Sequence, residues 1–223
     1  MNLLGKLIVL EGLDGSGKST QLDMLVENLS GLDVNFKTVS FPEYAEPSCE
    51  PVKMYLSGRF GDRPDDVNAY AASLFFAVDR YASYKLKWGE FYNSGGLVIA
   101  GRYFTSNAIH QTSKLPESEW DSYLDWLYDL EINRVAMPKP DRVIFLDMPV
   151  EIADRLVSKR YGGDEAKKDI HEKDSDYLKM CRKAALYAGK KFSWDIVDCA
   201  EGGEPKKREE ISDIILNLVK EVI

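Results

Sequence analysis

The sequence predicts an α/β protein built on a mostly parallel, five-stranded sheet with helices on both faces. Short apolar stretches alternate with helical ones along the chain, which is typical of right-handed crossovers between parallel strands. A glycine-rich loop with the spacing G-x-x-x-x-G-K-S, residues 12–19, directly follows the first apolar stretch. The chain of 223 residues is 44% hydrophobic, enough for the core of one domain, which we expect to span residues 1–223.

The expected elements follow from hydrophobic periodicity. The expected strands are Leu4–Leu10, Val34–Phe41, Leu97–Ala100, Arg142–Leu146 and Asp195–Val197. The expected helices are Lys18–Leu29, Glu50–Leu56, Asn68–Trp88, Glu117–Val135, Val150–Lys159, Ser175–Ala188 and Glu209–Val222. Ligands of such sheets bind at the carboxyl ends of the strands. We therefore expect the loops that follow the first three strands to converge on one cleft, with the aromatic-rich helix Asn68–Trp88 as a wall.

The glycine-rich loop has the spacing of a phosphate-binding loop. Glycines let successive backbone N–H groups point at a polyphosphate, and the following helix adds its positive N-terminus. Lys18 can reach the β- and γ-phosphates, and the Ser19 hydroxyl can bind Mg²⁺. The alternative, a chance glycine-rich turn, is disfavoured because strand, loop and helix occur in the required order. The expected ATP-binding residues are Gly12, Asp14, Gly15, Ser16, Gly17, Lys18, Ser19 and Thr20.

Composition restricts the partners of the protein. The net charge of −8 argues against a nucleic-acid partner, which requires a basic surface, but it is compatible with small phosphorylated ligands. We expect no secretion signal and no membrane anchor, because no apolar stretch approaches the ~20 residues that span a bilayer. Three widely spaced cysteines form no C-x-x-C pair, so we expect reduced thiols in a cytoplasmic protein.

Several short motifs, taken together with the phosphate loop, resemble the thymidylate kinase family of P-loop nucleoside monophosphate kinases. The resemblance spans nearly the whole chain. It rests on residues 10–21 (LEGLDGSGKSTQ), 41–43 (FPE), 75–80 (FFAVDR), 102–103 (RY) and 140–147 (PDRVIFLD). It implies the P-loop NTPase fold with a small lid, and transfer of the γ-phosphoryl group of ATP to dTMP, giving dTDP and ADP for dTTP synthesis. It also implies Mg²⁺ as cofactor and a homodimer.

Arg102 is the expected cationic clamp of this reaction. Phosphoryl transfer needs an acceptor held in line and stabilisation of the charge on the transferred group. A guanidinium directly after the third strand has the planar fork suited to bridging donor and acceptor phosphates. The alternative for Arg102 is a surface salt bridge. Lys18 and Arg102 are thus the first two expected catalytic residues.

The resemblance also implies the acceptor site. Phe76 matches the position that stacks on thymine, and Arg80, on the same helical face, matches the residue that binds a base carbonyl. Asp14 matches the carboxylate that receives the 3′-hydroxyl. Composition alone would place Phe76 in the core, make Asp79-Arg80 a solvated charge pair and make Asp14 a turn residue.

Further acceptor contacts are expected on both sides of Arg102. The resemblance includes Phe41 and Pro42 among them, and Ser106, His110 and Gln111 follow Arg102 on a helical turn that faces the acceptor. Gln111 could bind the thymine edge. His110 falls where relatives carry an aromatic residue under the ribose, and it could instead be an ordinary polar residue.

The lid is expected at residues 160–173. This stretch contains glycines that allow motion, and basic residues that could close over ATP or form a solvated charged loop. Family members carry a catalytic arginine either in the phosphate loop or in the lid. Because Gly15 occupies the position in the phosphate loop, Arg160 is the expected catalytic arginine of the lid.

Two departures from the family pattern keep other functions open. Gly101 replaces an aspartate that helps to organise Mg²⁺, and Tyr44 stands where an arginine usually holds the dTMP phosphate. One alternative is a deoxynucleoside kinase or another nucleotide kinase. The other is a degenerate phosphate-loop protein that binds nucleotide without turnover.

Overall fold

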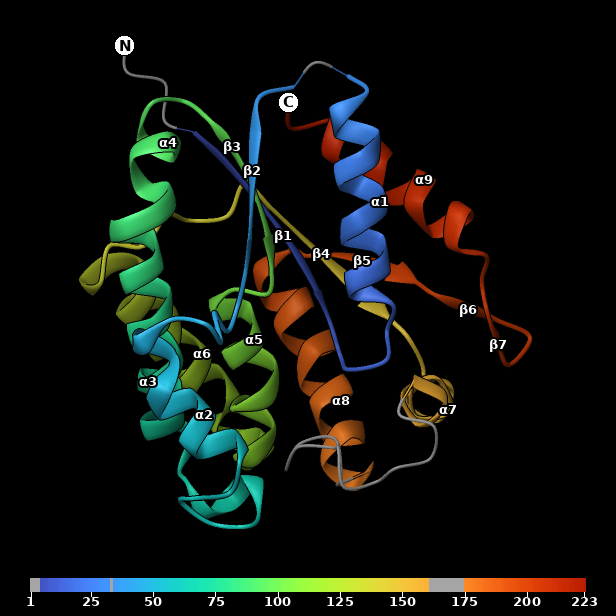
Figure 1. Ribbon diagram of the computed structural model, residues 1–223. Helices are drawn as coiled ribbons and strands as arrows, with labels where there is room; N and C mark the ends of the chain where they lie inside the picture. Colours follow the sequence, from blue (N-terminus) through green and yellow to red (C-terminus); the bar gives the residue numbers. More distant parts are fainter. Residues whose placement is uncertain (1–4, 33, 161–174) are drawn as a thin grey trace.

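The computed structural model describes residues 5–32, 34–160 and 175–223. Its main sheet has five parallel strands in the order β2-β3-β1-β4-β5 (Figure 1). The strands are β1 (Lys6–Gly12), β2 (Phe36–Ser40), β3 (Leu97–Gly101), β4 (Arg142–Asp147) and β5 (Asp195–Asp198), followed by a hairpin of β6 (Ala200–Glu201) and β7 (Glu204–Pro205). The expected class, an α/β fold with a five-stranded parallel sheet, is confirmed.

The helices cover both faces of the sheet (Figure 1). They are α1 (Lys18–Ser30), α2 (Glu50–Leu56), α3 (Ala69–Ser83), α4 (Gly89–Asn93), α5 (Phe104–His110), α6 (Trp120–Tyr128), α7 (Val150–Arg160), α8 (Ser175–Phe192) and α9 (Arg208–Lys220). Short 3₁₀ turns lie at Pro47–Cys49, Pro64–Asp66, Thr112–Lys114 and Glu117–Glu119.

Side chains alternate between the two faces along each central strand, as the pleat of a strand requires. On β1, Leu7 and Val9 pack with α5, α6 and α8, whereas Ile8 and Leu10 pack with α1 and α9. The near-continuous apolar sequence of β1, β3 and β4 follows from burial on both faces, which is typical of parallel sheets. The two helical layers therefore hold the central strands between them. The loops at the carboxyl ends of these strands start from fixed positions.

The expected helix Asn68–Trp88 is not one regular α-helix. Asn68 caps α3 through its side chain, which accepts a 2.9 Å hydrogen bond from the backbone N–H of Ala71. The chain then widens into a π-helical turn at Tyr84–Trp88 before α4. Likewise, the expected helix Glu117–Val135 consists of a 3₁₀ turn, α6 and a π-helical turn at Asp129–Arg134. Such π-helical turns depend on tertiary packing. The periodicity of hydrophobic residues in the sequence therefore does not predict them.

The carboxyl ends of β1, β2 and β3 lie side by side, as expected. In the parallel register, Gly101 at the end of β3 pairs with Leu10 of β1 and with Ser40 of β2. The glycine-rich loop, the Phe41-Pro42 segment and Arg102 therefore leave the sheet at one edge.

Candidate functional site: a phosphate loop facing an arginine clamp

The glycine-rich loop joins β1 to α1 through backbone conformations that favour glycine. Gly15 and Gly17 have φ values of 81° and 85°, and α1 begins directly after Gly17. Because L-side chains rarely adopt such angles, these two glycines are required by the turn itself. The hydroxyl of Ser16 is buried and has no hydrogen-bond partner among the described residues. A buried polar atom of this kind is expected where a ligand completes the site.

A cavity of about 530 Å³ opens over this loop. Its lining combines loop residues with segments far along the chain: residues 13–21, Met148, Leu156, Val157, Lys159, Pro205, Lys206, Arg208 and Ile211. The amine of Lys18 lies inside the turn, 3.4 Å from the carbonyl oxygen of Gly12. The structure thus brings together loop amides, a lysine and the N-terminus of α1, which is the arrangement that binds a polyphosphate.

Arg102 leaves β3 with φ 68°, a conformation uncommon for a residue other than glycine. Its backbone N–H donates to the carbonyl oxygen of Leu10 at 3.0 Å, which ties it to β1. Its guanidinium donates to Asp14 Oδ1 at 2.6 Å and to the Ser106 hydroxyl at 3.3 Å. Arg102 does form an ion pair, with Asp14. Because its side chain is only 15% exposed, this pair is not the surface salt bridge considered from the sequence. Strained backbone at a charged group is typical of functional sites.

Glu11 is a buried residue of this site to which sequence reasoning gave no role. Its side chain is fully buried, and Oε1 accepts hydrogen bonds from the Tyr103 N–H (3.1 Å), the Thr105 hydroxyl (2.6 Å) and the Ser106 hydroxyl (2.9 Å). Because Ser106 also contacts Arg102, Glu11 holds the turn that presents the guanidinium. The signal in the sequence was a carboxylate inside an otherwise apolar strand.

Helix α3 carries the expected base-binding residues. Phe76 is half-buried, with its ring edge-on to Tyr55 at a centroid distance of 6.3 Å, so it is not a fully buried core residue. Arg80 is buried and forms a two-point ion pair with Glu131 of the π-helical turn after α6. Asp79 is also buried and accepts hydrogen bonds from the Glu43 N–H (2.9 Å) and the Ser48 hydroxyl (3.0 Å). The reading of Asp79-Arg80 as a solvated pair is wrong, because each group is buried with its own partner.

His110 lies behind Arg102 in a buried position. Burial and the neighbouring Arg102 guanidinium lower the pKa of His110 to about 3, so the ring is neutral near pH 7. Its Nε2 lies 3.4 Å from the Arg102 guanidinium, which can only donate, and Nδ1 lies 3.6 Å from the sulfur of Cys181. Nε2 is therefore the acceptor and Nδ1 carries the hydrogen. This geometry makes His110 a support for Arg102, whereas its contact with a ribose stays a prediction.

Gln111 is fully buried, and neither its amide nitrogen nor its amide oxygen has a partner among the described residues. Phe41 is buried and packs 6.2 Å from the ring of Tyr103, while Pro42 is half-buried beside it. The orphaned amide of Gln111 fits a residue completed by a ligand. Phe41, by contrast, supports the turn through its packing against Tyr103.

Three expected features of the site are only partly visible or are altered. Arg160 is the last residue of α7, and the remainder of the expected lid, residues 161–173, lies outside the described residues. Gly101 supplies no carboxylate at the end of β3, and Tyr44 is exposed. Within the described ranges, no three His, Cys, Asp or Glu side chains are grouped to hold a metal ion. Any Mg²⁺ there would depend on Ser19 and on the phosphates of a bound nucleotide.

Sequence reasoning also missed the far wall of the phosphate-loop cavity, which Pro205, Lys206 and Arg208 form. The β6–β7 hairpin turns at Gly202 and Gly203, with φ values of 59° and 83°, and brings Pro205 to the cavity. Gln21 Nε2 donates to the carbonyl oxygen of Arg208 at 2.9 Å and joins α1 to α9. The double glycine was a usable signal for the turn, but the sequence does not show that the hairpin reaches the loop.

Asp147 is the last residue of β4 and is paired with an arginine of α8. Both of its oxygens accept hydrogen bonds from Arg182 of α8, at 2.6 and 2.8 Å. This two-point pair raises the pKa of the Arg182 guanidinium. The pair therefore ties α8 to β4.

Comparisons with known proteins agree on one family. The sequence model of the family described as "Thymidylate kinase" matches residues 10–209. The thymidylate kinase of Mycobacterium tuberculosis (strain H37Rv) is 31% identical over 188 residues, covering 82% of this chain and 84% of that protein. The probable thymidylate kinase of Pyrobaculum aerophilum is 26% identical over 218 residues, covering 97% of each chain.

A solved structure of the thymidylate kinase of Candida albicans has a similar fold. The TM-score is 0.71 at 22% sequence identity, and the match covers 98% of this chain and 92% of that one. At this identity the likeness supports the fold. The assignment to a family comes from the sequence matches.

Proposed function

This chain belongs to the thymidylate kinase family, and we propose that it is an ATP-dependent kinase that phosphorylates dTMP, giving dTDP and ADP. The observation that carries the proposal is the position of Arg102, whose guanidinium contacts Asp14 of the phosphate loop on one side and Ser106 of α5 on the other. A cation between a donor loop and an acceptor helix is what phosphoryl transfer requires. The alternatives, a nucleoside kinase and a binding-only protein, are not favoured by the relatives.

The donor side fits ATP. The unpartnered hydroxyl of Ser16, the amine of Lys18 and the left-handed glycines form a cradle for phosphates, and the 530 Å³ cavity extends from it to Arg208. When bound, Mg²⁺ would neutralise phosphate charge, with the Ser19 hydroxyl as its protein ligand. Mg²⁺ keeps several waters and binds mainly through substrate phosphates, so one hydroxyl suffices for a site of this kind.

The acceptor side fits a pyrimidine deoxynucleotide. In this proposal the half-buried ring of Phe76 stacks on the base, while Arg80 and the unpartnered amide of Gln111 bind its edge. Asp14 receives the 3′-hydroxyl, and Arg102 moves from Asp14 to the phosphates as substrate enters. His110 then keeps Arg102 oriented through its neutral Nε2.

The chain's own residues account for the catalytic step in this proposal. Lys18 and Arg102 hold the donor and acceptor phosphates in line, and both stabilise the charge that spreads over the transferred group. We assign Arg160 of the lid as the third cation. Burial of Glu11 fixes the turn, so that the guanidinium of Arg102 needs little reorganisation during transfer.

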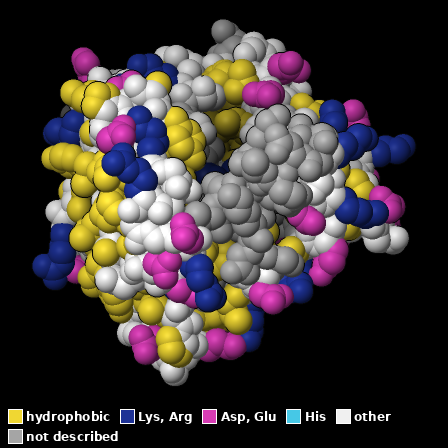
Figure 2. Space-filling model, turned by 60° about the horizontal axis from the view of Figure 1, so that its bottom comes forward, with side chains coloured by type: hydrophobic (Ala, Val, Ile, Leu, Met, Phe, Trp, Pro, Cys, Tyr) yellow, Lys and Arg dark blue, Asp and Glu magenta, His cyan; other side chains and the backbone are white. Residues whose placement is uncertain are grey.

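We also propose that the protein acts as a homodimer in the cytoplasm. The exposed apolar side chains Tyr70, Leu74, Val78 and Tyr81 recur along one face of α3. Figure 2 shows hydrophobic side chains gathered along the left of that view, the side on which α3 lies in Figure 1. Such a contiguous patch is typical of an interface.

All three cysteines are free thiols, which suits a reducing compartment, and no helix in the described ranges could cross a membrane.

The experiment that tests the proposed reaction is a coupled ADP-release assay. MgATP is combined in turn with dTMP, dUMP, UMP, dCMP, dGMP, AMP and thymidine. The proposal predicts turnover with dTMP and weaker turnover with dUMP. Turnover with thymidine alone would assign a nucleoside kinase, and ATP binding without turnover on any acceptor would assign a binding-only protein. Light scattering after gel filtration tests the dimer, and a monomeric mass would exclude it.

A further inference from the structure

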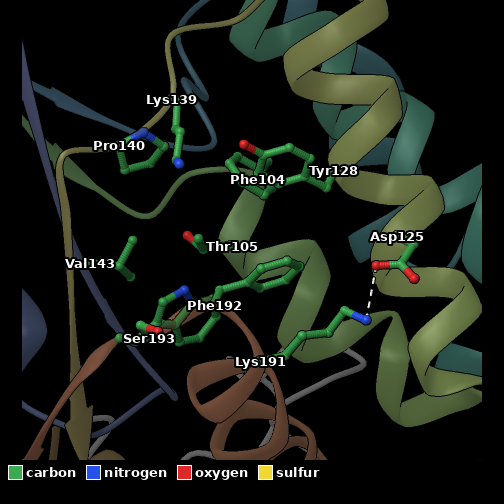
Figure 3. Close-up of a pocket in the computed structure, with 11 residues that line it drawn as sticks. Phe104, Thr105, Asp125, Tyr128, Lys139, Pro140, Val143, Lys191, Phe192 and Ser193 are labelled. Atoms are coloured by element: carbon green, nitrogen blue, oxygen red, sulfur yellow. Dashed lines mark ion pairs between the residues drawn. The ribbon is translucent and has the colours of Figure 1, made fainter.

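A second cavity of about 350 Å³ lies between α5, α6, the C-terminal end of α8 and the segment before β4 (Figure 3). Among the described residues, none lines both this cavity and the phosphate-loop cavity. Its volume is within the range of small-ligand pockets, roughly 300–1,000 Å³, and near the lower limit. It suits a ligand of one or two rings.

Aromatic side chains form one part of the lining of this cavity. Phe104, Tyr128, Phe192 and Trp194 are four of its eleven lining residues. The rings of Tyr128 and Phe192 are stacked, with an interplanar angle of 23° and a centroid distance of 5.9 Å, and Phe104 meets Tyr128 edge-on. Figure 3 shows Phe104, Tyr128 and Phe192 bordering the space. Flat faces and ring edges of this kind favour a planar aromatic ligand over an aliphatic one.

Lys139 and Lys191 lie at opposite ends of the cavity in Figure 3. The amine of Lys191 lies 2.9 Å from both Asp121 and Asp125, so its end of the cavity carries two carboxylates and one ammonium and does not attract an anion. Lys139 is exposed and forms no ion pair within the described part of the chain. Figure 3 shows the amine end of Lys139 directed toward the space beside Thr105. A single unpaired ammonium next to an apolar pocket favours a ligand with one negative group, and it is too little charge for a polyphosphate.

The wall of the cavity also contains an unusual backbone conformation. Ser193 has φ 57°, in the left-handed region, and it ends α8 where the N–H of Trp194 donates to the carbonyl oxygen of Gly189 at 2.8 Å. Glycine is the usual residue at such a helix end, so the serine retains mild strain. This turn sets Phe192 and Trp194 on either side of Ser193, and all three line the cavity.

We propose that this cavity is a second ligand site, which binds a small planar aromatic molecule with one carboxylate or equivalent anionic group. The ring lies among Phe104, Tyr128 and Phe192, and the anion contacts Lys139. Thr105 lines the cavity and donates its hydroxyl to Glu11, so a ligand here touches a residue of the Arg102 network. The site is separate from the phosphate-loop cavity, since the two share no lining residue in the described structure.

The test is calorimetric titration of the full chain with 2-naphthoate while ADP and dTMP are present at saturating concentrations. Filling the nucleotide sites removes binding there. The matched variants are Lys139→Met and Lys190→Met, which remove the same charge from exposed positions inside and outside the cavity lining. The neutral isostere 2-naphthamide is titrated in parallel. Because both lysines are exposed, each variant is expected to keep the unfolding midpoint of the wild-type protein.

The proposal predicts one bound naphthoate per chain. Affinity should fall about fivefold or more in Lys139→Met and stay unchanged in Lys190→Met, as expected for one partly exposed ion pair. The amide should bind about fivefold more weakly to the wild-type protein for the same reason. Absence of binding while ADP and dTMP fill the nucleotide sites, equal affinity in Lys139→Met, or equal affinity for the amide would each overturn the assignment.

Discussion

At the scale of single residues, the orientation of Arg102 depends on groups that are themselves buried. Glu11 accepts three hydrogen bonds from the turn after β3, and Ser106 connects that carboxylate to the guanidinium. His110 contacts the guanidinium from behind. A clamp on a surface loop would lose more side-chain entropy when it closes on phosphate, whereas here the turn is already fixed and only the guanidinium has to move from Asp14 to the phosphates.

Glu11→Gln tests this support. The neutral amide oxygen of glutamine accepts these hydrogen bonds more weakly than a carboxylate oxygen does, so the turn should shift and kcat should fall roughly tenfold, with a smaller change in KM for dTMP. Ser106→Ala should give a comparable loss, and the double variant should lose less than the sum of the two effects on the free energy of activation, because both act through Arg102. Steady-state kinetics measure all three.

Glu90→Gln is the matched control for Glu11, because Glu90 is exposed on α4. It should leave kcat unchanged. An unchanged kcat in Glu11→Gln, with the fold intact by circular dichroism, would show that the buried carboxylate does not position Arg102.

His110 leads to a prediction about pH. Its pKa is about 3 in the folded protein and near 6.5 in an unfolded chain, so below pH 6.5 the unfolded state binds more protons. Stability from the neutral ring is therefore complete above pH 6.5 and is lost progressively as pH falls toward 3. Between pH 7 and pH 5 the wild-type protein should lose about 2 kcal/mol more unfolding free energy than His110→Asn.

Urea unfolding at both pH values measures this difference. The remaining titratable groups are common to the two proteins, so they cancel in the comparison. Equal losses in the wild-type protein and in His110→Asn would mean that His110 is not held neutral by burial.

At the scale of elements, α3 is joined to the turn after α6 by the buried Arg80–Glu131 pair. Removing one member of a buried pair leaves an uncompensated charge, so Glu131→Leu should lower the unfolding free energy by about 3–5 kcal/mol. The double variant Arg80→Met/Glu131→Leu should recover much of that loss, because both charges are absent. Lys53→Met, in an exposed pair of α2, should change it by less than about 1 kcal/mol.

The same double variant separates the structural role of Arg80 from its proposed contact with the base. If Arg80 also binds dTMP, recovered stability should be accompanied by a raised KM for dTMP. A double variant with wild-type stability and a wild-type KM would confine Arg80 to joining α3 and the π-helical turn.

The end of β3 leads to a prediction about Mg²⁺. A Cβ atom on Gly101 would lie 3.1 Å from Leu22 Cδ2 of α1 and 3.2 Å from Ser40 Oγ of β2, which a small shift can accommodate. Gly101→Asp should therefore fold with a loss of about 1 kcal/mol. It should lower the Mg²⁺ concentration for half-maximal rate several-fold, because it adds a carboxylate beside the nucleotide site.

Gly101→Ala is the matched control, since it adds the same Cβ without the carboxylate. The metal requirement of Gly101→Ala should equal that of the wild-type protein. If Gly101→Asp and Gly101→Ala behave alike in a Mg²⁺ titration, a carboxylate at this position does not organise the metal.

At the scale of the whole molecule, the hydrophobic pattern of the sequence was enough to predict where the five strands of the main sheet lie. Each expected strand overlaps an observed one, because burial on both faces leaves few polar residues in β1, β3 and β4. The phosphate loop was predictable for a different reason: glycine spacing and strand–loop–helix order are local. Their local character let the sequence predict the position of the loop, whereas the contacts of its residues with ATP stay a prediction.

The parts that sequence reasoning missed depend on contacts between distant segments. Glu11 meets Thr105, and Arg80 meets Glu131, across long stretches of chain, so neither buried carboxylate revealed its partner. The break in the expected helix Asn68–Trp88 has the same origin, as the π-helical turn at Tyr84–Trp88 adjusts the packing of Trp88 against the core. Whole-molecule packing also formed the second cavity, which has no motif in the sequence.

The measurement that tests the central claim most directly follows the phosphoryl group itself. The protein is incubated with ATP labelled on its γ-phosphate, Mg²⁺ and dTMP, and the labelled products are separated, with Arg102→Lys as the comparison. The account predicts that the label appears in dTDP, and that transfer slows about a hundredfold in Arg102→Lys, because an ammonium cannot bridge two phosphates as a planar fork does. Label recovered only in ATP or in inorganic phosphate, or equal transfer by the variant, would contradict it.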